Sequence, residues 1–183
     1  MKVSREQVAE NRRRILDAAA QLFRERGFEN VTVAEVMSAA GLTHGGFYGH
    51  FDSKEALIDA AMAHEPSARR GGRATLDNPS RYADSYLSRQ HRDNVGSGCP
   101  FSALGTEVVR ASASVRHTMT ESLRRWIDAY TPASQGSTAQ ERRRNAIATV
   151  SSMVGAMVLA RIADDERLSD EILAAARASL PLS

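Results

Sequence analysis

A short stretch without acidic residues combines hydroxyl and imidazole side chains with glycines. Residues 43–50 read Thr-His-Gly-Gly-Phe-Tyr-Gly-His, and no carboxylate occurs between Leu42 and Phe51. Hydroxyl and imidazole groups can hydrogen-bond to phosphate oxygens and base edges. Two adjacent glycines cost a helix roughly 1 kcal/mol each relative to alanine, but their missing side chains let a backbone approach a groove. This composition predicts contact with nucleic acid.

The residues before this stretch predict a short helix with an explicit start and end. Thr32 and Glu35 have capping-box spacing, and Val31 lies where a hydrophobic staple begins. Gly41 allows the sharp turn that ends this helix. Thr43 can cap a second short helix that continues to about residue 48.

A longer amphipathic helix precedes the pair. Residues 7–26 place Ile15, Ala19, Leu22 and Phe23 on one face at helical spacing. Two short helices that meet through a glycine-containing turn, behind a longer helix, form the plan of a helix-turn-helix DNA reader.

The rest of the chain also predicts helices and no sheet. Asp52 with Glu55 and Thr138 with Glu141 repeat the capping-box spacing, and residues 66–77 read as a loop. Further helices are expected at about 52–64, 78–92, 100–113, 114–130, 138–163 and 169–180. The fold class is therefore all-α, with about nine helices.

Composition is that of a soluble globular protein, with 42% hydrophobic and 25% charged residues in a chain of 183. The 24 basic and 22 acidic side chains give a net charge of +2, and residues 1–65 hold 8 basic against 10 acidic side chains. The part of the chain that contains the predicted DNA reader is thus not basic as a whole. DNA binding must rest on local geometry.

Several other classes of protein lack support in the sequence. No secretory signal is recognisable, and the apolar stretch 146–160 is shorter than the roughly 20 residues that a membrane-spanning helix needs. We expect a cytoplasmic protein with no membrane partner. Neither CxxC nor a histidine cluster indicates a metal site. The motifs GxSxG, HExxH and the P-loop are missing, so we expect no enzyme and no cofactor.

The stretch VTVAEVMSAAGLTHGGFYGHFDSKEAL, residues 31–57, resembles the TetR/AcrR family of bacterial transcriptional repressors. The likeness covers about residues 10–60, and the number of expected helices fits the family beyond them. Members of that family are all-α homodimers. The resemblance implies a three-helix helix-turn-helix DNA-binding domain at residues 1–52 and a helical ligand-binding and dimerisation domain at residues 53–183.

The same resemblance implies which residues contact double-stranded operator DNA. Thr32 corresponds to a phosphate contact at a helix start, Tyr48 and His50 to phosphate and groove contacts, and Lys54 to a phosphate anchor. Bases or backbone would be contacted by Thr43, His44, Gly45 and Gly46.

Two alternatives stay open within this domain. Tyr48 could belong to the aromatic core with Phe47 and Phe51, although its position on a 3.6-residue helix points it elsewhere. The side chains of residues 12–14, all arginine, could steer toward phosphates or form a solvated helix face.

Apolar and aromatic residues of the second domain predict a small-molecule site. The candidates are Tyr82, Tyr86, Cys99, Phe101, Leu104, Met119, Trp126 and Met153. The alternative is that these side chains form ordinary core. A noncovalent inducer that binds at this site in the second domain would release the protein from its operator.

The single cysteine offers another route of control. Cys99 precedes Pro100 at an expected helix start, a position that favours reactive thiolates. The segment resembles that of the NemR-like subgroup of the family, which includes electrophile- and oxidant-responsive repressors. The alternatives are a small buried hydrophobe or, with His91 upstream, a nucleophile and its base.

A dimer interface is expected on the last two helices. Ile147, Val150, Val154 and Val158 form a stripe at helical spacing, and Ile172 adds apolar area from the final helix. Two such helix pairs related by a twofold axis would match a palindromic site. The alternative is that the stripe packs inside one subunit.

These observations predict a ligand-responsive repressor that binds a palindromic operator as a homodimer and is released by a small-molecule or electrophile inducer. A helical adaptor that does not bind DNA is the remaining alternative. It would explain the helices but not the glycine pair beside Tyr48.

Overall fold

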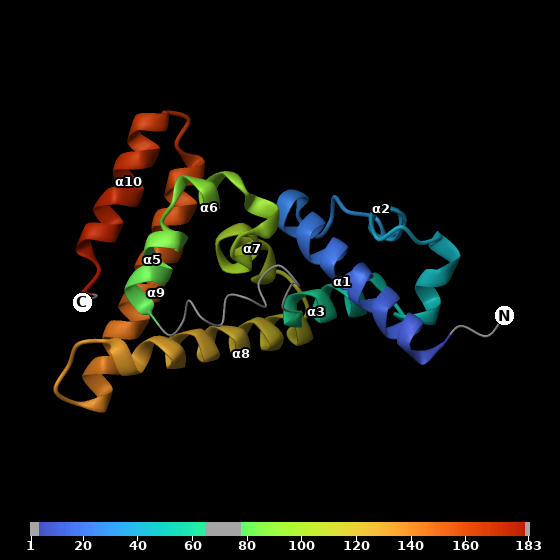
Figure 1. Ribbon diagram of the computed structural model, residues 1–183, viewed down its shortest axis with the longest axis horizontal. Coiled ribbons are helices and arrows are strands. Elements are labelled where there is room, and N and C mark those ends of the chain that lie inside the picture. Colours follow the sequence, from blue (N-terminus) through green and yellow to red (C-terminus); the bar gives the residue numbers. More distant parts are fainter. Residues whose placement is uncertain (1–3, 65–77, 182–183) are drawn as a thin grey trace. The chain divides into compact units, whose positions relative to one another are not determined.

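The computed structural model describes residues 4–64 and 78–181, which are helical and contain no strand (Figure 1). The predicted all-α fold class is thereby confirmed. These residues form two compact units. One comprises residues 4–64 and Leu104–Met119, and the other comprises residues 78–103 and 120–181. The predicted loop at 66–77 lies outside the described residues.

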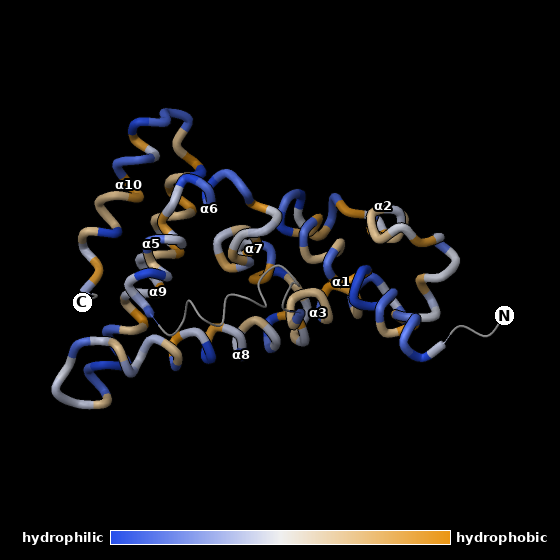
Figure 2. The backbone as a smooth tube through the Cα atoms, in the orientation of Figure 1, coloured by the Kyte–Doolittle hydropathy of each residue, from blue (hydrophilic) through white to orange (hydrophobic). Residues whose placement is uncertain are grey.

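The first unit begins with the helices of the predicted DNA reader. They are α1 (Arg5–Arg26), α2 (Val33–Ala39), the 3-10 helix η1 (His44–Gly49) and α3 (Lys54–Ala63). Hydrophilic and hydrophobic residues are interleaved along α1 (Figure 2). Its apolar face packs with α2 and α3. Side chains without exposed surface in this core include Ile15, Phe23, Val31, Val36, Met37 and Leu57.

Both ends of α2 form as predicted. The Thr32 hydroxyl accepts a hydrogen bond from Glu35 N, and the Glu35 carboxylate accepts one from Thr32 N, so the capping box is complete. Gly27, which ends α1, and Gly41, which ends α2, have φ of 82° and 68°. Such values suit glycine because it lacks a Cβ.

The start of α3 differs from the prediction. Ser53 caps this helix by accepting a hydrogen bond from Ala56 N at 3.0 Å, and α3 begins at Lys54. The expected capping box of Asp52 with Glu55 is therefore wrong, because the neighbouring serine occupies the cap position.

Two carboxylates tie the corner between α7 (Pro100–Val108) and α8 (Ala113–Tyr130) to the first unit. Glu107 accepts a hydrogen bond from Phe28 N at 2.6 Å, directly after the end of α1. Asp59 of α3 accepts hydrogen bonds from Ser114 Oγ and Thr118 Oγ1, each at 2.5 Å. Residues far along the chain thus join the core of the predicted DNA reader.

The second unit consists of the helical segments that come before and after that corner in the sequence. They are α5 (Pro79–Tyr86), α6 (Arg89–Asp93), η3 (Val95–Ser97), the remaining parts of α7 and α8, η4 (Thr131–Ala133), α9 (Ala139–Ile162) and α10 (Glu166–Ser179). The predicted helix 78–92 is two helices, because Ser88 caps α6 through His91 N at 3.2 Å. The last helix begins before the expected Ser169, with Asp165 as its cap.

α9 and α10 lie side by side and antiparallel (Figure 1). The predicted capping box of Thr138 with Glu141 starts α9. By length and composition, α9 is the one described helix that could cross a membrane, and 39% of its most apolar window is buried within the protein. This differs from the expectation based on residues 146–160. A helix such as α9, which packs in the core on one side and exposes apolar residues on the other, passes the same test of length and composition.

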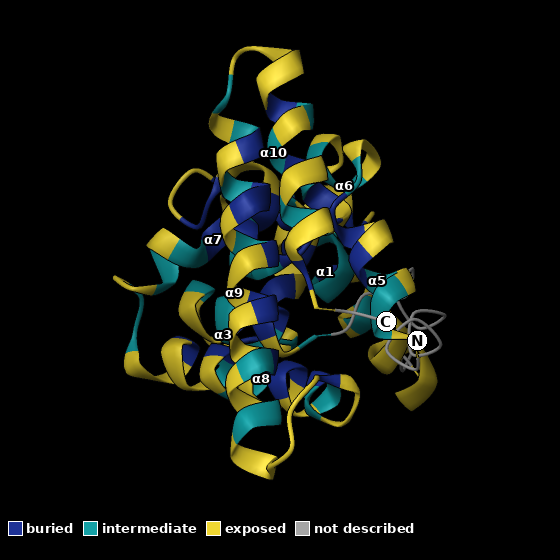
Figure 3. Ribbon diagram, turned by 90° about the vertical axis from the view of Figure 1, so that its left-hand side faces the viewer, coloured by how far each residue is buried: buried dark blue, intermediate teal, exposed yellow. Residues whose placement is uncertain are grey.

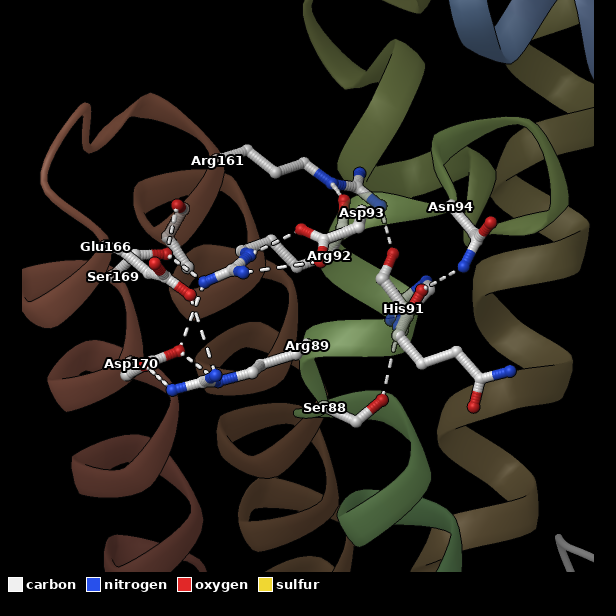
Figure 4. A network of polar contacts seen from close by, with 12 residues as sticks. Ser88, Arg89, His91, Arg92, Asp93, Asn94, Arg161, Glu166, Ser169 and Asp170 are labelled. Atoms are coloured by element: carbon white, nitrogen blue, oxygen red, sulfur yellow. Dashed lines mark hydrogen bonds and ion pairs between the residues drawn. The ribbon is translucent and has the colours of Figure 1, made fainter.

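A polar network holds α6 against the start of α10 (Figure 4). Arg92 donates to Ser169 Oγ at 2.9 Å and Asp170 Oδ1 at 3.1 Å, while Ser169 donates to Ala160 O at 2.6 Å. Arg89 also pairs with Asp170. These contacts order α6, which has no buried residue of its own.

Candidate functional site

The residues predicted to read DNA lie on a 3-10 helix rather than an α-helix. Within η1, Gly46 N donates to Thr43 O at 3.0 Å and His50 N donates to Phe47 O at 2.8 Å. Thr43 occupies the predicted cap position before η1, but its side chain makes no capping hydrogen bond. Three glycines in this six-residue segment weaken α-helix formation, and a 3-10 turn is the usual form of such short pieces.

Most of the predicted contact residues face solvent. Among them His50 and Lys54 are half-buried, and the exposed ones are Thr32, Thr43, His44, Gly45, Gly46 and Tyr48. Tyr48 is 70% exposed, whereas Phe47 and Phe51 are 1% and 5% exposed and stack with ring centroids 5.8 Å apart. Tyr48 therefore does not belong to the aromatic core.

The Thr32 hydroxyl is engaged within the protein. It donates to Glu35 Oε2 at 2.7 Å in addition to accepting from Glu35 N. Hydrogen bonds from the Thr32 backbone and side chain, followed by Arg26, lower the pKa of Glu35 to about 2. The carboxylate thus stays ionised, and a phosphate contact through this hydroxyl would have to displace it.

Arg12 holds the end of the reading element. Its Nη1 donates to His50 O at 2.6 Å, and its guanidinium carbon lies 4.2 Å from the centroid of the Phe51 ring. Sequence reasoning offered phosphate steering or a solvated face for this arginine and missed the contact. Arginine side chains often lie over aromatic rings. Nothing in the sequence indicated which ring Arg12 would contact, because Phe51 lies 39 positions further along the chain.

The second unit gathers most of the predicted ligand-binding residues. Tyr86, Cys99, Trp126 and Met153 are buried in one core, against which Tyr82 and Phe101 pack as half-buried rings. Leu104 and Met119 are buried in the first unit instead. The structure therefore brings six of the eight candidates together and separates two.

Cys99 is 4% exposed and its backbone is tightly bonded. Cys99 N donates to His91 Nε2 at 2.9 Å, while His91 Nδ1 lies 2.7 Å from Tyr86 O. Because Nε2 accepts, Nδ1 carries the proton and donates to the carbonyl. The imidazole thus bonds to the Cys99 backbone rather than acting on its thiol as a base, and this arrangement is not a catalytic nucleophile–base pair.

Arg161, on α9, organises the same region and was missed by the sequence reasoning. It donates to Arg92 O at 3.1 Å, His91 O at 2.9 Å and Ser102 Oγ at 3.1 Å. Burial is the largest influence on its pKa and lowers it. An arginine in the otherwise apolar part of α9 was the available signal.

The predicted dimer stripe is only partly exposed. Val150 is 3% exposed and packs in the core of the unit, Val154, Val158 and Ile172 are half-buried, and Ile147 is 42% exposed. Figure 3 shows both buried and exposed residues along α9. Its exposed apolar and small residues from 147 to 162 are Ile147, Ala148, Ser151, Ser152, Gly155, Leu159 and Ile162.

Family models match both parts of the chain. The model for bacterial regulatory proteins of the tetR family matches residues 15–61, and the model for the C-terminal domain of LmrA/YxaF-like transcriptional regulators matches residues 80–175. The second match spans more than half of the 183 residues. The chain belongs to the TetR family.

Two curated proteins similar to this TetR-family chain are repressors. It is 50% identical over 51 residues to the HTH-type transcriptional repressor KstR2 of Rhodococcus jostii, covering 28% of this chain and 25% of that protein. It is 27% identical over 121 residues to the repressor DhaR of Mycobacterium sp., covering 63% and 61%. The chain therefore matches less than two thirds of the length of either relative.

Solved structures share the fold of this TetR-family protein over nearly its full length. The reduced form of E. coli NemR superposes with a TM-score of 0.73 at 25% identity, covering 93% of this chain and 94% of that one. A regulator from Cytophaga hutchinsonii gives 0.72 at 18% identity over the whole of both chains. The two family models and these named relatives are those of transcriptional regulators.

Proposed function

We propose that this TetR-family protein is a cytoplasmic, ligand-responsive repressor that binds palindromic operator DNA as a homodimer. The observation that carries the proposal is the exposed face of η1. Tyr48 stands out into solvent beside two exposed glycines, while the neighbouring Phe47 and Phe51 anchor the segment in the core. An exposed aromatic hydroxyl on an anchored element is suited to contact a phosphate or a groove edge.

Operator binding tests the assignment of the reading residues. An operator is first selected from random oligonucleotides, and affinity is then measured by fluorescence anisotropy at several salt concentrations. Lys54→Ala should weaken binding roughly tenfold and reduce the salt slope by about 1, because one phosphate contact is lost. Tyr48→Phe should weaken binding with little change in thermal unfolding.

Arg124→Ala provides the matched control, because Arg124 is an exposed basic residue of α8 that pairs with Glu121 in the same helix. Its affinity for the operator should equal that of the wild type. Unchanged affinity for both Lys54→Ala and Tyr48→Phe would place the reading surface elsewhere.

Release of DNA by a noncovalent inducer is the favoured mechanism. Six candidate residues share one apolar core in the second unit, and a ligand shifts an equilibrium only through its different affinities for two states. Covalent modification of Cys99 is the alternative, and the burial of this residue counts against it. Titration of the native protein with a thiol reagent separates the routes, since rapid reaction of Cys99 would favour the covalent one.

A further inference from the structure

Three polar side-chain atoms of the second unit are buried without a hydrogen-bond partner. Among the described residues they are Tyr86 Oη, Trp126 Nε1 and Thr149 Oγ1. The three residues are 4%, 9% and 2% exposed. Folded proteins leave few buried polar atoms unpaired, so a group of them in one unit calls for a specific explanation.

Two of these atoms belong to neighbouring rings within an aromatic cluster. The ring centroids of Tyr86 and Trp126 are 5.6 Å apart. Phe101 stacks on Trp126 at 5.8 Å, and Tyr82 lies 6.0 Å from Tyr86 and 6.2 Å from Trp126. Tyr82 and Phe101 are only half-buried. The unpaired O–H and N–H groups therefore lie among flat apolar surfaces that extend to the outside of the unit.

The chemistry of these groups defines what would complement them. An indole N–H can only donate, and a neutral phenol donates readily. Burial, followed by the nearby Cys99 thiol, raises the pKa of Tyr86 far above its usual value, so the phenol stays neutral. Burying a further charge among these rings would carry a desolvation cost that a neutral group avoids. The missing partner is an uncharged hydrogen-bond acceptor.

We propose that the Tyr82–Tyr86–Phe101–Trp126 cluster binds a neutral, planar aromatic compound carrying a carbonyl-type oxygen, and that this compound class is the inducer. The rings supply stacking surfaces, while Tyr86 and Trp126 donate to the oxygen. The role as inducer rests on the proposed function as a ligand-responsive repressor. Binding to the cluster does not depend on it.

Three naphthalene probes separate shape from chemistry. 2-Acetonaphthone carries a carbonyl oxygen, 2-ethylnaphthalene has nearly the same shape without an acceptor, and 2-naphthoate carries a negative charge. Calorimetry on the full chain should give 2-acetonaphthone at least roughly tenfold higher affinity than either analogue, as expected for one added hydrogen bond and for the cost of burying a charge. Quenching of Trp126, the only tryptophan, reports binding independently.

A pair of tyrosines provides matched variants. The Tyr130 hydroxyl donates to Pro79 O at 3.2 Å, whereas the Tyr86 hydroxyl lies near the Cys99 thiol and the Ser102 hydroxyl without a well-aligned hydrogen bond to either. Tyr86→Phe should leave thermal stability without ligand unchanged or higher and should weaken 2-acetonaphthone binding roughly tenfold. Tyr130→Phe should lower that stability and leave the affinity unchanged. If Tyr86 had only a structural role, Tyr86→Phe would lower the stability and leave the affinity for 2-acetonaphthone unchanged.

Each outcome bears on a separate part of the proposal. Equal affinity for 2-acetonaphthone and 2-ethylnaphthalene, tighter binding of 2-naphthoate, failure of all three to bind, or unchanged affinity in Tyr86→Phe would overturn the ligand class. Binding of 2-acetonaphthone without release of the selected operator would overturn its role as inducer. Absence of operator binding in a gel shift without any probe would contradict the proposed function and leave the ligand result standing.

Discussion

At the scale of single residues, the reading element depends on a side chain from another helix. η1 has six residues and two adjacent glycines, so its own hydrogen bonds give it little rigidity. Arg12 bonds to the carbonyl of His50 and lies over the ring of Phe51. Both contacts act on the end of η1, which makes Arg12 a positioning residue in the proposed DNA complex.

Arg12→Gln therefore has an expected signature of its own. Loss of the charge-assisted hydrogen bond and of the ring contact should weaken operator binding roughly tenfold. The salt slope should remain that of the wild type, because the guanidinium is engaged by the protein and not by a phosphate. Anisotropy titrations at several salt concentrations measure both quantities. A slope smaller by about 1 would show instead that Arg12 contacts a phosphate.

At the scale of elements, the corner of α7 and α8 completes the fold around α1 and α3. Glu107 receives the Phe28 N–H just beyond the end of α1, and Asp59 receives two hydroxyl groups from the start of α8. Carboxylates that accept such hydrogen bonds anchor separate segments of a chain. Movement of this corner would therefore act directly on the helices that carry the reading element.

Glu107→Ala should destabilise the protein by about 1–3 kcal/mol, because the partly buried Phe28 N–H would lose its acceptor. Glu107→Gln keeps a side-chain oxygen and should cost less. Urea unfolding, followed by circular dichroism, compares the two variants with the wild type. Equal stability of Glu107→Ala and the wild type would mean that water replaces the carboxylate without cost.

At the scale of the whole molecule, α9 leaves an apolar face in contact with solvent. Leu159 and Ile162 are 55% and 71% exposed, and Leu168 at the start of α10 is 48% exposed. Gly155 has open space where a Cβ would lie, so another helix can approach closely. Exposed apolar residues of this kind suit an interaction surface, and we propose a second copy of this chain as the partner, as the proposed palindromic operator would require.

Leu159→Arg should convert the dimer to monomers that still fold, because an arginine would be buried in the seam. Tight operator binding should be lost with the dimer. Val109→Arg is the control, since Val109 is 72% exposed in the first unit and its replacement should leave a dimer. Sedimentation in the ultracentrifuge measures the masses. A dimeric Leu159→Arg protein would place the interface elsewhere.

Local sequence determined the helices wherever start and stop signals were short-range. Thr32 with Glu35, Thr138 with Glu141, Gly27 and Gly41 act within a few residues, and each forms in the structure as predicted. Two of the failures were local competitions between neighbouring candidates. Ser53 took the cap expected of Asp52, and Ser88 divided one predicted helix into two.

Tertiary structure alone decided which side chains meet across long stretches of chain. The bonds from Arg12 to His50, from Phe28 to Glu107, and from Arg161 to His91 join residues 38, 79 and 70 positions apart. No helical periodicity encodes such pairs, because periodicity specifies only the face of one helix. The same limit applied to Val150 and Leu104. Both were correctly read as apolar, but only packing decided that each is buried within its own unit.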